Sequence, residues 1–159
     1  MKRPIVVLVT ATALAGCSSS FQHHSASTSA THSVTASAAA ISQLRRTCSA
    51  QATWNKRGQA MVSALYADTG ALAADARANN ASGVTKAGRK LASDALAAAT
   101  LPLPPMGAQS WKTLTASYAT AGTAIAAGAA SNAVPQLEEG NGAISTFSGA
   151  IGRCAGLPS

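Results

Sequence analysis

Histidine is the side chain that most often carries acid–base and metal chemistry, and this chain has little of it. Its three histidines, His23, His24 and His32, all fall in one stretch rich in Ser, Thr and Ala. They could chelate a transition-metal ion weakly, but no acidic or thiol partner stands beside them in a fixed geometry. We therefore interpret them as solvated linker histidines, and we predict no metal site.

Carboxylates offer a second route to catalysis. The chain has five acidic residues: Asp68, Asp75, Asp94, Glu138 and Glu139. The last two are adjacent, so on a helix they point about 100° apart and do not form a facing pair. A carboxylate pair drawn from two different helices stays open at this point.

The other common catalytic patterns are missing. Residues 41–159 contain no histidine, which excludes Ser-His-Asp and Cys-His arrangements within that range. The segment Gly140-Asn141-Gly142 lacks the lysine and the strand–turn–helix context of a phosphate loop. We predict that the protein is not an enzyme and uses no cofactor.

The first residues of the chain have the pattern of an export signal. Met1-Lys2-Arg3 is positively charged, and Pro4 to Ala15 is uncharged and mostly apolar. The apolar run is shorter than the roughly 20 residues that a spanning helix needs. A secretory signal peptide over residues 1–16 is therefore favoured over a permanent membrane span.

The residues that follow this run define its class. Leu14-Ala15-Gly16-Cys17 resembles the lipobox of bacterial lipoproteins, in which an aliphatic and two small residues precede a cysteine. The resemblance covers residues 1–17. It implies cleavage before Cys17, a diacylglycerol and fatty acyl chains such as palmitate on that cysteine, and residence on the extracytoplasmic face of the cell membrane. Two or more acyl chains would anchor the protein stably.

Composition divides the remainder into a linker and a domain. Residues 17–40 contain many Ser, Thr and Ala and no charged side chain, which predicts a disordered spacer. Residues 41–159 are long enough for one core. The richness in alanine resembles that of small envelope lipoproteins from GC-rich genomes such as those of actinobacteria, but this likeness is compositional and identifies no binding residue.

Four ranges of the domain have helical periodicity, namely about 43–78, 84–99, 107–130 and 133–154. The first has an apolar stripe formed by Leu44, Cys48, Val62, Leu65, Leu72 and Ala76. Gln51, Asn55 and Gly58 interrupt this stripe, which permits a bend or break near 55–58. The third has the most regular repeat, formed by Trp111, Leu114, Tyr118, Ala121, Ile125 and Gly128. An all-α, antiparallel up-down four-helix bundle follows. The many glycines of the last two ranges either allow close helix approach or make these helices irregular.

Cys48 and Cys154 form an even pair in a domain predicted to be exported, which favours a disulfide. The first and last helices of an up-down bundle bring these two positions to the same end. The alternative is a pair of free thiols acting as a redox switch or as half of a metal site.

Two sets of side chains are candidates for binding. Lys86, Arg89 and Lys90 share one helical face, with further basic spots at Arg45-Arg46 and Lys56-Arg57. The aromatic residues form the second set and could line a pocket between helices, although they more often supply core packing: Trp54, Tyr66, Trp111 and Tyr118.

The mature chain would keep a formal charge of +5 without Lys2 and Arg3, which suits anionic lipid or wall polymer. The cations are scattered and no nucleic-acid-binding motif accompanies them, so we expect no nucleic-acid partner. The favoured hypothesis is a non-catalytic interaction or structural module of the cell envelope that binds another envelope component. The alternative is a helical bundle that binds a small ligand between its helices.

Overall fold

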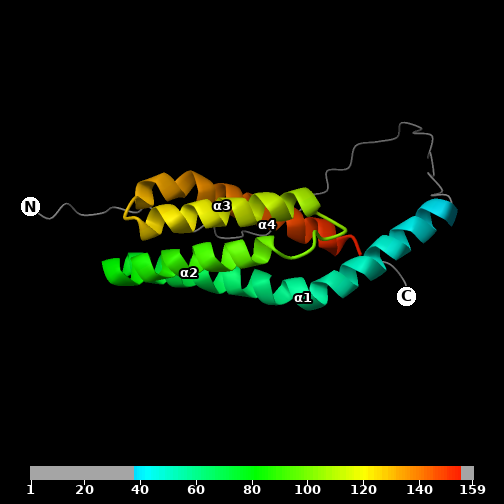
Figure 1. Cartoon of the computed structure of the whole chain (residues 1–159). Coiled ribbons are helices and arrows are strands. Elements are labelled where there is room, and N and C mark those ends of the chain that lie inside the picture. Colours follow the sequence, from blue (N-terminus) through cyan, green and yellow to red (C-terminus); the bar gives the residue numbers. More distant parts are fainter. Residues whose placement is uncertain (1–37, 155–159) are drawn as a thin grey trace, which may run out of the picture.

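The computed structural model describes residues 38–154, which form four helices running back and forth along a common direction (Figure 1). Helix α1 spans Ala38–Arg77, α2 spans Ala81–Ala99, α3 spans Ala108–Ala126 and α4 spans Val134–Gly152, with a short 3-10 helix, η1, at Ala130–Ala133. The predicted all-α four-helix bundle is confirmed. The predicted signal peptide, Cys17 and the three histidines lie outside the described residues.

Helix α1 has 40 residues and continues through the region where a break was considered possible. It begins at Ala38, inside the range predicted to be linker. Its first turns extend past the ends of the other helices (Figure 1). Leu44 was expected to face the core but is 38% exposed, because no other helix within residues 38–154 covers this overhanging part of α1.

The third helix carries the repeat that the sequence predicted. Trp111, Leu114, Tyr118, Ala121 and Ile125 are all at most 3% exposed and belong to one continuous core. Full burial of an apolar side chain of leucine size stabilises the fold by about 1.5–3 kcal/mol relative to exposure.

The same helix ends earlier than predicted. It stops at Ala126 rather than near residue 130, and Gly128 follows with a φ of 81°. That left-handed backbone conformation suits glycine and ends the helix. Gly128 is therefore exposed instead of completing the apolar stripe.

Helices α2 and α3 cross at two glycines. A Cβ atom added to Gly122 would lie 2.5 Å from the backbone nitrogen of Ala92 and 2.6 Å from the carbonyl oxygen of Gly88. A Cβ on Gly88 would lie 2.6 Å from a methyl carbon of Ile125. The question left open for the glycines is thus resolved here in favour of close helix approach.

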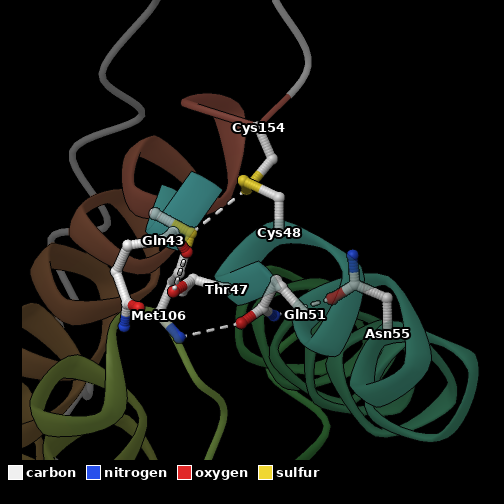
Figure 2. The surroundings of a disulfide bond; sticks show 7 residues. All are labelled: Gln43, Thr47, Cys48, Gln51, Asn55, Met106 and Cys154. Atoms are coloured by element: carbon white, nitrogen blue, oxygen red, sulfur yellow. Dashed lines mark hydrogen bonds between the residues drawn. A yellow bond between two sulfur atoms is a disulfide. The ribbon is translucent and has the colours of Figure 1, made fainter. Parts of the chain in front are cut away.

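A disulfide joins the two ends of the folded domain (Figure 2). Cys48 near the start of α1 is bonded to Cys154 just after α4, with an S–S distance of 2.09 Å and a sequence separation of 106. The predicted pairing is confirmed. We call this end of the bundle the disulfide pole: α1 as far as Arg57, the connection 100–107, the first turns of α3 and the last turns of α4.

Alanine at Gly122 should destabilise the protein by about 1–3 kcal/mol, since the added methyl group would meet the backbone of α2 and push the helices apart. Gly149 offers a matched control in α4, because a Cβ there would meet nothing within 4 Å. Gly149→Ala should stabilise by up to about 1 kcal/mol through helix propensity. Urea unfolding of both variants measures the contrast, and equal effects would contradict the close approach.

Removal of the disulfide should cost about 4–5 kcal/mol, because the bond closes a loop of more than 100 residues and so restricts the unfolded chain. The test compares unfolding of the native chain with that of Cys48→Ala/Cys154→Ala, which leaves Cys17 in place. Reduced native protein should match the variant. A loss below about 1 kcal/mol would be inconsistent with the loop-closure argument.

Candidate functional site

Three aromatic rings meet at the disulfide pole. Trp54 of α1 lies edge-on to Trp111 of α3 and to Phe147 of α4, with centroid distances of 5.0 and 5.6 Å. Trp111 and Phe147 lie 5.4 Å apart. Such edge-to-face pairs contribute about 0.5–1.5 kcal/mol beyond area burial. The cluster therefore joins three helices at one point.

Gly58 explains how a tryptophan fits on α1. A Cβ atom at Gly58 would collide with the six-membered ring of Trp54, so the glycine leaves the space that this ring occupies. Gly58 interrupts the apolar stripe, but Trp54 could not adopt its position if a larger residue stood there. The sequence pattern suggested a bend here, whereas the structure uses the small residue for packing.

Two side chains of α1 hold the connection between α2 and α3. The Trp54 indole N–H donates to the carbonyl oxygen of Pro102 at 2.6 Å. The backbone N–H of Met106 donates to Gln51 Oε1 at 2.9 Å, and Gln51 Nε2 donates to Asn55 Oδ1 at 2.8 Å (Figure 2). Gln51 is only 1% exposed. A polar residue that interrupts the predicted stripe is therefore a buried tie between α1 and this connection.

Two open grooves flank Trp54. The proline groove has a volume of about 240 Å³ and is lined by Ala50, Thr53, Trp54, Arg57, Leu101, Pro102, Leu103 and Pro105. The helix groove has a volume of about 260 Å³ and is lined by Trp54, Asn55, Gln59, Val62, Phe147, Ser148 and Ile151. Neither groove is lined by an acid, a histidine or a cysteine of the described chain. Both can accept apolar side chains and offer a few polar groups at the edge.

The four aromatic residues proposed as pocket lining do not gather in one pocket. Trp54 lines both grooves, while Trp111 is buried behind it. Tyr118 is buried in the core, where its hydroxyl donates to Asn141 Oδ1 at 2.7 Å and burial raises its pKa to about 12. Tyr66 is 52% exposed and lines neither groove. Phe147 as the third ring and Gln51 as the tie were not predicted from the sequence.

The proposed basic face is also divided. Lys86 and Arg89 are exposed, but Lys90 is engaged by two carboxylates. Its ammonium lies 2.9 Å from Asp68 Oδ1 on α1 and 2.7 Å from Asp94 Oδ2 one turn along α2. The carboxylate pair from two helices, which the sequence left open, is therefore present and is bridged by a lysine.

Burial and charge act in opposite directions on this pair. Asp68 is 3% exposed, and burial raises its pKa although Lys90 lowers it in part. The hydrogen bond from Lys90 lowers the pKa of Asp94. Asp68 Oδ2 is buried without a hydrogen-bond partner in the part of the chain that the structure describes. Lys90 thus offsets the cost of burying the Asp68 carboxylate, and its role is to stabilise the fold.

Within residues 38–154, no group of three or more His, Cys, Asp or Glu side chains is placed to hold a metal ion. No helix of that range has both the length and the apolar character needed to cross a bilayer. The chain matches no protein-family model, no curated protein and no solved structure. A function must therefore be inferred from its own residues.

Methionine at Lys90 should destabilise the fold most at neutral pH. Loss of the partner of a buried polar group costs about 1–3 kcal/mol. Without the ammonium, the pKa values of Asp68 and Asp94 in the folded protein rise. The deficit is therefore largest above these raised pKa values and shrinks as the pH falls through them toward the pKa values that the two groups have beside Lys90.

The measurement is urea unfolding at neutral and at acidic pH. The exposed Lys86 is the control, and Lys86→Met should change stability by less than about 0.5 kcal/mol at both pH values. A deficit for Lys90→Met that does not depend on pH would show that packing of the lysine stem, rather than its charge, is what matters.

Proposed function

We propose that this chain is a lipid-anchored, extracytoplasmic lipoprotein whose helical bundle acts as a non-catalytic interaction module of the cell envelope. The observation that carries the proposal is the pair of open, largely apolar grooves on the two sides of Trp54. They lie at the disulfide pole, at which α1 also begins, and the helix groove continues beyond the pole to Gln59 and Val62.

Export and anchoring are supported by two independent features of the cysteines. Leu14-Ala15-Gly16-Cys17 has the lipobox pattern directly after an apolar run. The remaining cysteines, Cys48 and Cys154, are bonded to each other. Disulfides persist in oxidising compartments outside the cytoplasm. All three cysteines thus have a role that fits a protein on the outer face of the cell membrane.

The size of the grooves supports contact with a partner surface. Pockets that enclose small molecules usually measure about 300–1,000 Å³. The grooves, of about 240 and 260 Å³, are smaller and open. Trp54 is 9% exposed, so a partner would meet only a small part of its ring and would bind mainly to the groove walls. Side chains of an envelope protein laid across Trp54 would fill both grooves, whereas a small ligand would stay largely in water.

A non-catalytic role is supported by the placement of the reactive groups. The Asp68–Lys90–Asp94 cluster lines neither groove, and its lysine is committed to the two carboxylates. The proline groove has one charged lining residue, Arg57, and the helix groove has none. The hydroxyls of Thr53 and Ser148 line the grooves, but no acid or histidine of the described chain lies there to act as their base, which suits recognition better than proton transfer.

Site-specific photo-crosslinking in cells tests this proposal. A photoreactive residue at Thr53 or Ser148, which are exposed at the two grooves, should capture the same envelope protein. The same residue at Thr120, exposed on α3 away from both grooves, should not capture it. Replacement of Cys17 by Ala should abolish capture, because the domain would leave the membrane surface.

Three other outcomes would count against the proposal. Equal capture at Thr53 and Thr120 would show that the contact is not specific to the grooves. Capture that persists after Cys17→Ala would remove the role of the anchor. No adduct at either groove, together with thermal stabilisation of the chain by a low-molecular-weight cell extract, would favour the small-ligand alternative.

A further inference from the structure

The charges of the described chain are separated along the bundle. The disulfide pole has six exposed basic side chains, from Arg45, Arg46, Lys56, Arg57, Lys112 and Arg153, and no acidic residue. The rest of the described chain has all five acids and four basic residues. One end is thus strongly positive, and the remainder is close to neutral.

The packing described above establishes that these six cations share one end. Arg45 and Arg46 lie within one turn of Cys48, and Arg153 directly precedes its disulfide partner. Lys56 and Arg57 follow Trp54, and Lys112 follows Trp111, with which Trp54 is in ring contact. The ion pairs found among residues 38–154 are those of Lys90, so none of the six is neutralised by a carboxylate there.

Apolar side chains are exposed at the same end. Ile41 and Leu44 on the overhanging turns of α1 are 41% and 38% exposed, and Leu103 in the proline-rich connection is 48% exposed. Basic residues mixed with exposed aliphatic residues are typical of surfaces that lie on anionic bilayers, where the apolar groups enter the interface and the cations meet phosphates. An anionic wall polymer would satisfy the cations but would leave these apolar groups in water.

We propose that the disulfide pole docks directly onto an anionic phospholipid surface, so that the domain rests on the membrane instead of standing away from it. The inference rests on the proposed lipid anchor at Cys17. Helix α1 starts 21 residues after that cysteine, and a chain of this length reaches at most roughly 70 Å. The tether therefore brings the pole within reach of the bilayer, and the cations and apolar groups determine that it binds.

The two tryptophans give a native probe of this contact, because Trp54 and Trp111 both lie at the disulfide pole and are the only tryptophans in the chain. Lipidated protein is reconstituted into vesicles of phosphatidylcholine, with or without phosphatidylglycerol, each containing a trace of dansyl-labelled lipid. Flotation reports the anchor, and energy transfer from tryptophan to dansyl reports the distance of the pole from the lipid.

We expect the protein to float with both kinds of vesicle, and energy transfer to be higher on the anionic ones and to fall as salt is added. Arg45→Gln/Arg46→Gln should lower the transfer toward the phosphatidylcholine level. The matched control Lys86→Gln/Arg89→Gln, which removes the same charge outside the pole, should leave it unchanged. Equal transfer on the two kinds of vesicle, or equal effects of the two double variants, would overturn the proposal.

A separate measurement distinguishes failure of the anchor from failure of the docking. If mass spectrometry finds no lipid on Cys17, the proposed anchoring is wrong, and the unlipidated chain is then tested on the same vesicles. Its partition onto anionic vesicles should fall about 25-fold in Arg45→Gln/Arg46→Gln, at roughly fivefold for each basic residue. Binding to soluble polyglutamate without any preference for anionic vesicles would identify a polymer-binding pole and exclude docking on lipid.

Discussion

The position of Trp54 is the constraint on which the rest of the disulfide pole depends. Its ring occupies the space above Gly58, meets Trp111 and Phe147, and leaves its N–H directed at Pro102. One side chain of α1 thereby contacts α3, α4 and the connection that follows α2. Because interiors are closely packed, moving this ring would disturb all of these neighbours together.

The disulfide stabilises the same end of the bundle through a different physical effect. Trp54 contributes contact energy in the folded state, whereas the bond between Cys48 and Cys154 mainly restricts the unfolded chain. Together they hold the ends of the first and last helices side by side. This matters for the proposed roles, since both grooves and the six basic side chains lie where these ends meet.

The two proposals share part of one surface, since Arg57 and Leu103 line the proline groove and also belong to the disulfide pole, while the helix groove shares no basic side chain with that pole. Grooves beside Trp54 are lined mainly by apolar groups and open on the flanks of α1. The basic and exposed aliphatic side chains extend farther, onto the overhanging turns near Ile41 and Leu44. Docking of the overhang on lipid would hold the domain in one orientation, and a fixed orientation lowers the entropic cost of binding a neighbouring envelope protein.

The local sequence pattern was sufficient to predict those features that depend only on the spacing of residues along the chain. The repeat from Trp111 to Ile125 predicted a helix and its buried face, because residues three and four apart lie on one side of any helix. The number of helices followed from the four periodic ranges, and the pairing of Cys48 with Cys154 followed from the even number of remaining cysteines and the up-down order of the helices. None of these inferences required knowledge of which side chain touches which.

Contacts between distant residues were decided only by the tertiary structure. Gln51 and Gly58 seemed to interrupt a stripe, yet one binds the backbone of Met106 and the other makes room for Trp54. Lys90 was predicted to belong to a free basic face, yet it forms an ion pair with Asp68 on another helix. The charge of the disulfide pole, too, arises from cations more than 100 positions apart along the chain. By itself, the sequence determined the helices and their number, and its lipobox pattern predicts an address at the cell membrane. The role of each polar or small residue depended on its partner across the bundle. A hydrogen bond or a close approach involves two segments of the chain, whereas sequence periodicity describes only one segment at a time.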